Sequence, residues 1–452
     1  MLRRRMGYAD PTSGRDLLGN RSLCFIFICA FGLVTLLQQI LYGKNYIKRE
    51  EMESAPSSRV QRRGLGGYRC YAPLNGGLYA AVVCKPAQQF SRLKGDETGN
   101  WTGPVNFLDD GSLKPARNGK KRYLDSYDGS YDYNSTACKE LRQEIMDVKV
   151  LTMVKTSELF ERWRNLQVCK WQQNMVETNN FKMSLSRCCN APSFLFTTKR
   201  NTPAGTKLRY EVDTSGILPI STEVFKMFPD DMPYSKSQFK KCAVVGNGGI
   251  IKNSKCGKDI DSADFVFRCN IPPINEKYSA DVGAKTDLVT INPSIITERF
   301  QKLEKWRRPF YEVLQNYENS SVVLPAFYNT RNTDVSFRVK YMLDDFDSQR
   351  GVFFFHPQYL LNVQRFWTVQ GVRAKRLSSG LMLVTAAMEL CEEVHLYGFW
   401  AFPMNPSGIF ITHHYYDNVK PRPGFHAMPH EIFNFMHMHT RGILNVHSGP
   451  CT

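Results

Sequence analysis

The sequence predicts an α/β domain in which a mostly parallel central sheet is flanked by helices. The first observation is a set of three short apolar runs in the middle of the chain, which predict buried strands at 241–245, 265–267 and 287–292. The second is that each run leads to an asparagine: Asn247, Asn270 and Asn292. Carboxyl ends of parallel strands meet at one edge of a sheet, where open α/β sheets bind ligands. These side chains are therefore predicted to line a ligand-binding edge.

The first predicted strand passes at once into Gly246-Asn247-Gly248-Gly249. A glycine turn after a strand lets the backbone approach a nucleotide phosphate. The run is not Gly-x-Gly-x-x-Gly, and no Asp or Glu ends the second strand to bind a ribose, so a nicotinamide dehydrogenase is disfavoured. Taken alone, the run is equally compatible with a plain tight turn.

The other elements follow from periodicity and from helix breakers. Apolar residues at helical intervals predict a helix near 138–172, which Cys169 and the Cys188-Cys189 pair could tie down. The basic segment 187–241 contains prolines that argue against long helices. Further helices are predicted at 297–316 and 381–391, and further strands at 321–326, 352–355 and 394–398.

Two stretches near the end of the chain carry chemistry. Ser378-Ser379-Gly380 precedes the predicted helix 381–391, where hydroxyls and backbone N–H groups can bind a phosphate. The alternative is plain N-capping by serine, and the two roles can coexist. Farther on, His414-Tyr415-Tyr416-Asp417 and His426 with Glu431 concentrate histidine and acid without forming a His-Glu-x-x-His zinc pair.

The composition limits the class of partner. The 452 residues are 42% hydrophobic, which is enough for one large core or two domains. Lys and Arg outnumber Asp and Glu by 59 to 42, a formal charge of +17 that favours an acidic partner. Without zinc-finger spacing or an RNA-binding motif, nucleic acid is not expected, and anionic lipid or an anionic sugar nucleotide fits better.

The N-terminal region predicts a membrane anchor. The apolar run 23–42 is long enough to span a bilayer, and arginines cluster before it. Its length, and the lack of an Ala-x-Ala-like site after it, disfavour a cleaved signal peptide. The expected organisation is a cytoplasmic tail 1–22, a signal anchor 23–42, a stem 43–137 and a lumenal domain 138–452.

Cysteines and glycosylation triplets agree with a lumenal domain. The chain has 13 cysteines and no Cys-x-x-Cys pair, so disulfides are expected and zinc is not. In the stem, Cys70 and Cys84 could close a small loop. Possible N-glycosylation acceptors are Asn100, Asn134 and Asn319.

Taken together, these stretches resemble the motifs of the animal sialyltransferases. The segment from Lys241 to Ser294 is similar to the large motif of that family, and Arg376 to Phe399 is similar to the small motif. The two histidine stretches look like the two short motifs, in the expected order. The resemblance covers about 138–452. It implies a single glycosyltransferase-A-like, Rossmann-like domain that transfers sialic acid from CMP-sialic acid with inversion.

The resemblance also implies a role for each site residue. His426 would be the general base, and Glu431 would fix its region. Without a metal or cofactor, the leaving phosphate would be stabilised by Ser378, Ser379, Gly380 and His414. Asn247, Asn270 and Asn292 would hold the CMP moiety. Trp400 would pack on the nucleotide, and its alternative role is that of a core tryptophan. Asp345-Phe346-Asp347 and Asp259-Ile260-Asp261 have a metal-binding spelling but are expected to bind none.

The family pattern further implies the disulfides Cys242–Cys391 and Cys256–Cys451, each contributing roughly 3–5 kcal/mol in the chain-entropy model. Cys451 and the details of the motifs resemble the α-2,8 branch, which is ganglioside-active in its most similar members. The expected acceptor is the 8-hydroxyl of a terminal sialic acid on a glycolipid, at the Golgi membrane. Oligo- or polysialylation of glycoproteins is the alternative, although the basic residues before the large motif are dispersed. A catalytically silent lectin is a further alternative, and a homodimer is left open.

Overall fold

The computed structural model describes residues 131–451 except 214, 235–238 and 421–425, together with the backbone of two short strands nearer the N-terminus. The chain divides into two units, Met1–Pro115 and Ala116–Thr452. In the first unit, β1 (Tyr68–Tyr71) pairs antiparallel with β2 (Val83–Pro86), and Cys70 is opposite Cys84 in the register. The predicted anchor at 23–42 and Asn100 lie outside the described residues. Among the residues that are described, no helix has the length and apolar character needed to cross a membrane.

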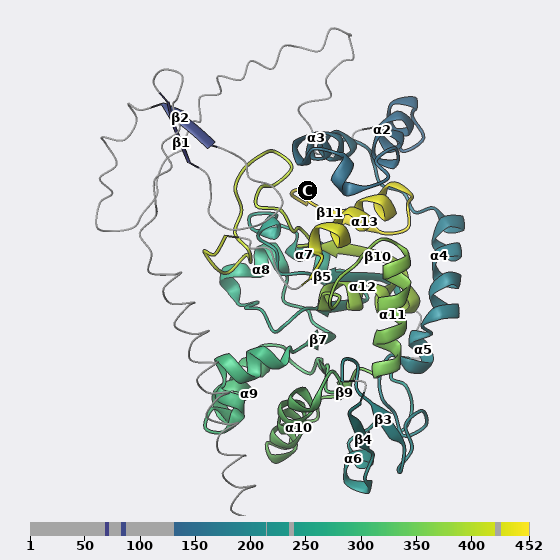
Figure 1. Cartoon of the computed structure of the whole chain (residues 1–452), viewed down its shortest axis with the longest axis vertical. Helices are drawn as coiled ribbons and strands as arrows, with labels where there is room; N and C mark the ends of the chain where they lie inside the picture. The colour runs from purple at the N-terminus through teal and green to yellow at the C-terminus, as the bar shows by residue number, and fades with distance from the viewer. Residues whose placement is uncertain are drawn as a thin grey trace, which may run out of the picture. The chain divides into compact units, whose positions relative to one another are not determined.

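The second unit is built on a seven-stranded sheet in which every strand pair is parallel (Figure 1). The prediction of a mostly parallel central sheet is confirmed, and the predicted strands are present with slightly shifted ends. The strands are β5 (Phe239–Val245), β6 (Phe265–Arg268), β7 (Leu288–Thr290), β8 (Ser321–Leu324), β9 (Val352–Phe354), β10 (Cys391–Tyr397) and β11 (Asn445–His447).

The strand order places a topological switch point beside β5. The order across the sheet is β11-β10-β5-β6-β7-β8-β9, so the chain runs outward from β5 to β9 and then returns to the other side of β5. The connections on the two sides of β5 therefore diverge at its carboxyl end. Ligands of open α/β sheets bind in the crevice at such a point.

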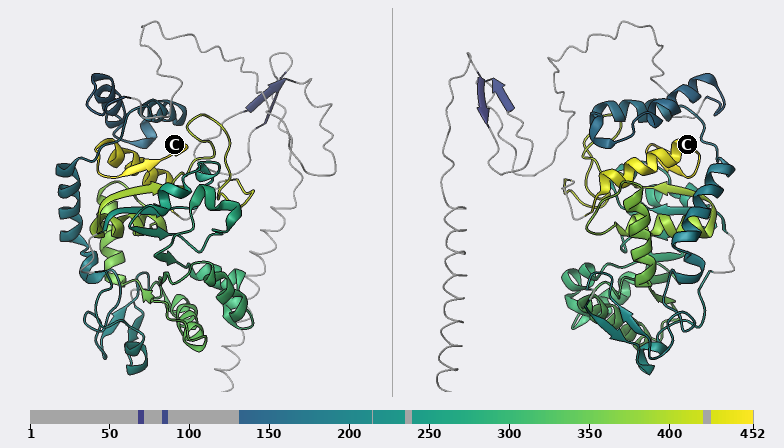
Figure 2. Two further views of the ribbon diagram at one scale, coloured as in Figure 1. Left: turned by 180° about the vertical axis from the view of Figure 1, so that it is seen from behind. Right: turned by 45° about the vertical axis from the view of Figure 1, so that its right-hand side comes forward.

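Both faces of the sheet are covered by helices (Figures 1 and 2). In β5, Cys242 and Val244 face one core while Ala243 and Val245 face the other, as expected for a parallel sheet buried on both sides. The first core contains residues of α2 (Thr136–Met146), α3 (Thr156–Leu166), α4 (Met175–Cys188), α5 (Ala191–Phe194), α11 (Pro357–Val369), α12 (Ser379–Leu390) and α13 (Met428–Thr440). The second contains residues of α7 (Gly257–Asp261), α8 (Glu276–Val282), α9 (Arg307–Gln315) and α10 (Thr330–Asp345).

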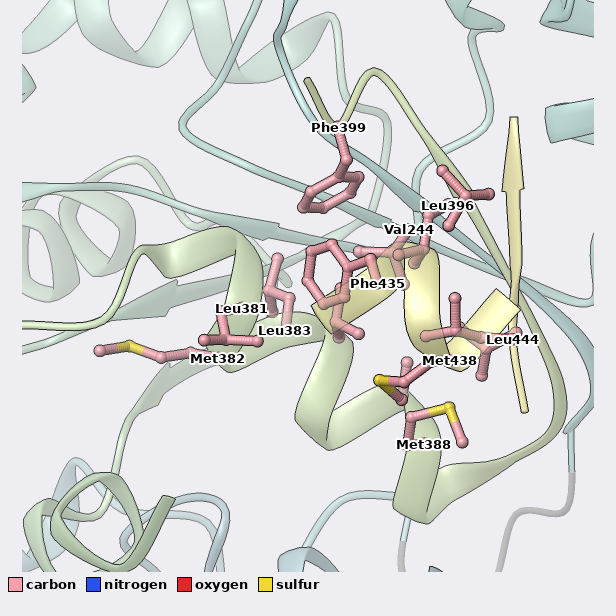
Figure 3. Close-up of a cluster of buried hydrophobic side chains, with 14 of the residues drawn as sticks. Val244, Leu381, Met382, Leu383, Met388, Leu396, Phe399, Phe435, Met438 and Leu444 are labelled. Carbon is pink, nitrogen blue, oxygen red and sulfur yellow. The ribbon is translucent and has the colours of Figure 1, made fainter. Parts of the chain in front are cut away.

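Near the switch point, α12 and α13 pack on the same face of the sheet. Figure 3 shows Met388 of α12 and Met438 of α13 among the buried side chains between these helices and the strands. Phe399, just after β10, meets Phe435 edge to face with ring centroids 5.5 Å apart. This packing fixes both helices relative to the sheet.

Two helical predictions were wrong in detail. The helix expected at 138–172 is divided into α2 and α3, with the 3₁₀ turn η1 (Leu151–Met153) between them, and α4 after it was not predicted. The helix expected at 297–316 begins with the π-helical turn η3 (Ile295–Arg299) and the 3₁₀ turn η4 (Gln301–Leu303), and only α9 is regular. All three residues of η4 have positive φ, a backbone conformation that interrupts a right-handed helix.

The remaining elements form a small appendage before β5. The strands β3 (Lys207–Arg209) and β4 (Ile217–Pro219) pair antiparallel, and the short helix α6 (Thr222–Lys226) follows them. The prediction of no long helix in this part of the chain is confirmed.

Four disulfides occur in the described part of the chain: Cys138–Cys169, Cys188–Cys189, Cys242–Cys391 and Cys256–Cys451. The last two are the pairs that the family resemblance implied, and they span 149 and 195 residues. In the chain-entropy model each stabilises the fold by roughly 5 kcal/mol. The expectation that Cys188 and Cys189 tie down the preceding helix was wrong, because these residues bond to each other.

Candidate active site

The loops after β5 and β10 touch each other at the switch point. The N–H of Gly246 donates to Tyr397 O at 2.8 Å, and the N–H of Gly248 donates to Gly398 O at 2.9 Å. A Cβ on Gly398, whose φ is +72°, would lie 2.2 Å from Gly246 O. The glycines after β5 are therefore needed for a close approach of two backbones. The sequence had suggested only a tight turn or an approach to a phosphate.

The first histidine motif lies against the same loop. Gly248 forms an isolated antiparallel bridge with His414, and the N–H of Tyr415 donates to Asn247 O at 3.0 Å. A side chain on Gly249 would clash with the backbone of Thr412, since its Cβ would lie 2.3 Å from the carbonyl oxygen. The structure thus brings His414 to the carboxyl end of β5.

The orientation of the His414 ring is set by Asp417. The carboxylate of Asp417 accepts the Nδ1–H of His414 at 2.6 Å and its backbone N–H at 3.1 Å. Burial alone would raise the pKa of Asp417, but the hydrogen bonds from His414 and Val419 lower it below its ordinary value. Tyr416 stacks on the imidazole, with centroids 5.1 Å apart. In the neutral ring Nε2 is then the nitrogen without a proton.

Two of the three predicted asparagines form side-chain hydrogen bonds beside the switch point. Asn247 donates its Nδ2–H to Cys269 O at 2.8 Å, and no described residue donates to its buried Oδ1. Asn270 has a φ of +64° and donates its Nδ2–H to Ser379 Oγ at 3.3 Å, linking the loop after β6 to the start of α12. Asn292 follows β7, one strand farther from the switch point.

Ser378 and Ser379 have different surroundings although they are neighbours. Ser378 is buried and caps α12 by accepting the N–H of Leu381 at 3.0 Å, which supports the capping interpretation. Its own N–H and hydroxyl both donate to the carboxylate of Glu431. Ser378 therefore has no donor left for a phosphate, whereas Ser379 is only half-buried. A Cβ on Gly380 would lie 2.7 Å from the ring of Phe399, so this glycine is required by packing.

The second histidine motif is attached to the residues before α12. His426 donates its Nδ1–H to Arg376 O at 2.8 Å, which leaves Nε2 as the unprotonated nitrogen of the neutral ring. Glu431, in the first turn of α13, is 2% exposed. Burial raises the pKa of Glu431, against the opposing effects of the Ser378 hydrogen bonds and of His426. Arg376 O and Ser378 N thus hold both members of the motif.

Trp400 is in the core and not at the edge of the crevice. It is 5% exposed, packs against Phe160 at 5.2 Å and Phe402 at 5.3 Å, and donates its indole N–H to Met404 O. Little of the ring is left for a nucleotide to stack on. Sequence cannot separate these roles, because a tryptophan after a strand fits both.

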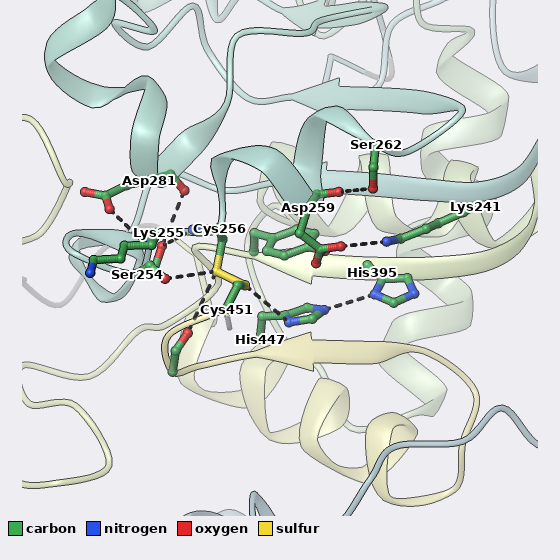
Figure 4. Close-up of a disulfide and its surroundings, with 12 residues drawn as sticks. Lys241, Ser254, Lys255, Cys256, Asp259, Ser262, Asp281, His395, His447 and Cys451 are labelled. Carbon is green, nitrogen blue, oxygen red and sulfur yellow. Dashed lines mark hydrogen bonds and ion pairs between the residues drawn. A yellow bond between two sulfur atoms is a disulfide. The ribbon is translucent and has the colours of Figure 1, made fainter. Parts of the chain in front are cut away.

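The two Asp-x-Asp sequences, which resemble metal-binding motifs, contain aspartates with partners in the protein. Asp345 pairs with Arg307 at the end of α10, and Asp261 accepts the backbone N–H groups of Ala284 and Lys285. Asp259 pairs with Lys241 at 2.8 Å and accepts the hydroxyl of Tyr397 (Figure 4). None of these carboxylates is hydrogen-bonded to the His414, His426 or Ser379 groups described above.

The polar cluster of Figure 4 lies beside the crevice, at the edge of the sheet. His395 of β10 and His447 of β11 share a hydrogen bond of 2.9 Å, next to the Cys256–Cys451 disulfide. Burial, the main cause, lowers the pKa of His447 to about 3. Because Cys451 is oxidised, the nearby group Asp259, His447 and Cys451 lacks the thiolate that would make it a metal site.

Sequence reasoning missed three contributors: Gly398, the Arg376 carbonyl and Asp417. Gly398 has the same signal as Gly246, a glycine directly after a strand. Asp417 is the last residue of the motif that begins with His414. The spacing of three residues could have indicated a contact between the two side chains. The contribution of Arg376 is a backbone carbonyl, for which the sequence holds no signal.

Known proteins are similar to this chain in sequence. The sequence model described as "Glycosyltransferase family 29 (sialyltransferase)" matches residues 196–443. "Alpha-2,8-sialyltransferase 8E" of Pan troglodytes is 63% identical over 447 residues, covering 99% of this chain and 100% of the relative. The protein of that name from Homo sapiens is 62% identical over the same shares of both chains. A solved structure, "Crystal Structure of a Mammalian Sialyltransferase in complex with Gal-beta-1-3GalNAc-ortho-nitrophenol", shows 20% identity and a TM-score of 0.37, covering 66% of this chain and 96% of that one.

Proposed function

Because this chain belongs to glycosyltransferase family 29, the sialyltransferases, we propose that it transfers sialic acid from CMP-sialic acid to the 8-hydroxyl of a terminal sialic acid on a ganglioside. The α-2,8 linkage is supported by the names of relatives that are 62–63% identical over nearly the whole chain. The observation that carries the chemistry is His426, whose Nδ1–H is bound to Arg376 O beside the Ser378–Glu431 pair.

In the proposed mechanism, Nε2 of His426 takes the proton of the acceptor hydroxyl as the new glycosidic bond forms. A histidine is suited to this step, because its ordinary pKa lies near the working pH. Attack of the hydroxyl on one face, with departure of CMP from the other, inverts the anomeric carbon. Glu431 acts through the start of α12 and α13, whose relative position its hydrogen bonds to Ser378 maintain.

The departing CMP phosphate gains negative charge, and the start of α12 offers groups that stabilise it. Free N–H groups and the positive end of a helix dipole attract anions at a helix N-terminus. Ser379 and the backbone of Gly380 are proposed as donors there. His414 from the opposite loop is proposed to donate its Nε2–H from the protonated ring, a form that the neighbouring Asp417 carboxylate favours. The unpartnered Oδ1 of Asn247 supports donor binding, since a buried acceptor is stabilised by a hydroxyl or amino group of the ligand.

We propose the Golgi lumen as the site of action, with residues 23–42 as the membrane anchor. The four disulfides in the described part of the chain support an oxidising compartment. A glycolipid acceptor is supported by the dispersed basic residues before β5, and short products are expected. Asn134 and Asn319 are exposed, as N-glycosylated residues must be.

The proposal is tested with the full chain, purified in mild detergent and given CMP-sialic acid in the presence of EDTA. The acceptors are sialylated gangliosides, a sialylated glycoprotein and the desialylated form of each. We expect transfer to the sialylated glycolipid and a fall in rate of roughly 10²–10⁴-fold for His426→Ala, the range of general acid–base catalysis. His430→Ala, four residues away on the same motif, is the matched control and should keep its rate.

The outcomes separate the parts of the proposal. Transfer to desialylated acceptors would contradict the α-2,8 assignment, and transfer to glycoprotein alone would contradict the glycolipid acceptor. An undiminished rate for His426→Ala would remove this residue as the base. Binding of CMP without any transfer would instead point to a sialoglycan-binding lectin.

A further inference from the structure

The side chain of Arg376, whose carbonyl holds His426, forms a largely buried ion pair. The guanidinium of Arg376 is 3.4 Å from the carboxylate of Glu211, with side-chain exposures of 15% and 2%. The plane of the guanidinium is fixed from another direction as well, because its Cζ lies 3.9 Å from the ring centroid of Tyr328. Stacking of this kind suits Arg, which is planar and weakly hydrated.

Glu211 belongs to none of the motifs, yet its backbone is firmly placed. Its N–H donates to Phe327 O at 2.9 Å, and the next residue, Val212, donates to Tyr328 O at 3.2 Å. The backbone around Glu211 therefore runs beside the segment after β8 that contains Tyr328. The side chain of Arg376 contacts both Glu211 and Tyr328. Burial, opposed by Arg376, raises the pKa of Glu211.

The backbone of Arg376 is the other half of the arrangement. Its carbonyl accepts the Nδ1–H of His426, and two residues later the N–H of Ser378 donates to Glu431. Displacing Arg376 by a fraction of an ångström would alter the hydrogen bond that sets the tautomer and tilt of the imidazole. Glu431 on α13 interacts electrostatically with His426, and Arg376 before α12 is paired with Glu211.

We propose that Glu211, through its ion pair with Arg376, is a positioning residue for the general base His426. The inference rests on the proposed function, in which His426 takes the acceptor proton. Glu211 touches neither substrate nor the reacting atoms. Its carboxylate holds the Arg376 side chain, Tyr328 holds the guanidinium plane, and the Arg376 carbonyl then presents a fixed acceptor to Nδ1–H.

The effect on the rate follows from the hydrogen bond. A fixed carbonyl holds Nδ1–H in one direction and so keeps Nε2 in one place. Loosening the bond spreads the ring over unproductive orientations. Misplacement by an ångström can reduce a rate by two orders of magnitude, and a smaller displacement reduces it less.

The test compares Glu211→Gln, Glu211→Asp and the unchanged full chain in the transfer assay. For Glu211→Gln we expect kcat to fall about tenfold and KM for CMP-sialic acid to change less than about twofold. Glu211→Asp, which restores the charge, should recover part of kcat.

A double-mutant cycle with His426→Gln shows whether Glu211 acts through the histidine. If it does, Glu211→Gln should cause no further loss in the residual rate of the His426→Gln enzyme. The matched control is Glu389→Gln, at a carboxylate that accepts Ala191 N–H and the Tyr359 hydroxyl away from this chain of contacts. The Glu389→Gln enzyme should keep the kcat of the unchanged chain.

A Glu211→Gln enzyme that is only less heat-stable, with kcat unchanged, would overturn the proposal and leave the ion pair a structural one. Equal losses from Glu211→Gln with and without His426 would overturn it too. A failure of the proposed function looks different. In that case the His426→Ala enzyme stays active, whichever residue occupies position 211.

Discussion

The serines before α12 show how a motif can contain two unlike residues. Ser378 caps the helix and gives both its donors to Glu431, while Ser379 receives the amide of Asn270 and stays half-buried. In this motif Ser378 therefore has a structural role, whereas Ser379 can contact a ligand. The sequence predicted both roles for the pair but not their division, because it gives no burial for adjacent polar residues at a helix start.

The first prediction separates these serines. Ser378→Ala should lower the free energy of unfolding by roughly 2–4 kcal/mol, since it removes an N-cap and leaves the buried Glu431 short of a donor. Ser379→Ala should leave stability within about 0.5 kcal/mol and reduce kcat about tenfold. Thermal unfolding and the transfer assay on the two variants measure both quantities. The reverse pattern would show that the assignment of the two serines is wrong.

Other residues divide in the same way. Asn247 and Asn270 were predicted at the carboxyl edge from strand ends alone, and the structure brings them to the crevice. For Trp400 the family resemblance implied packing on the nucleotide, with a core position as the alternative, and the residue lies in the core. The end of a strand determines at which edge of the sheet a residue lies. Whether its side chain is exposed or buried depends on the elements that pack against it.

Among the elements, the contact of the β5 and β10 loops matters most for the site. Gly246 and Gly398 approach so closely that neither tolerates a Cβ, and the second also has positive φ. The loops on the two sides of the switch point thereby lie in direct contact. The same contact holds Gly248, which pairs with His414.

The second prediction concerns this contact. Gly398→Ala should lower the free energy of unfolding by about 3–5 kcal/mol, because a clash with Gly246 O is added to the strain of a positive φ. Gly371 is the matched control, since its φ is +91° and a Cβ there meets nothing within 4 Å. Gly371→Ala should lose only about 1–2 kcal/mol. Equal thermal shifts for both variants would contradict the clash.

Elements were predictable where a short apolar run is bounded by turn residues, as at β5, β6 and β9. They were not predictable where the backbone departs from regular helix, as in η4, since Gln301, Lys302 and Leu303 all have positive φ without a glycine among them. Tertiary contacts hold these residues there, for example the buried Leu303 in the second core. Local propensity carries no information on such contacts.

For the whole molecule, the fold class followed from the sequence and the strand order did not. Nothing in the apolar runs shows that the chain leaves β9 and returns to β5 before forming β10. That return creates the switch point, and with it the site. Two long disulfides cross-link segments that this return brings together. One joins β5 to β10, and the other joins the start of α7 to Cys451.

The third prediction compares these disulfides. Replacing either pair by alanines should lower stability by roughly 5 kcal/mol in the chain-entropy model. Only the Cys256/Cys451 replacement should also raise KM for CMP-sialic acid, because the N–H of Cys451 donates to Ser254 O, near the loop after β5. The Cys242/Cys391 pair is its control, since Cys391 lies at the amino end of β10. A similar KM for both variants would contradict a link between the terminal disulfide and donor binding.

The same terminal disulfide sets an order of events during synthesis in the cell. Cys256 is synthesised 195 residues before its partner. At about 5–20 residues per second, roughly 10–40 s pass before the bond can form. During that interval the thiol of Cys256 can pair with other cysteines already synthesised, such as Cys242 and Cys269, the latter being unpaired in the described part of the final fold. The yield of correctly folded protein should therefore depend on the supply of thiol–disulfide isomerase in the host.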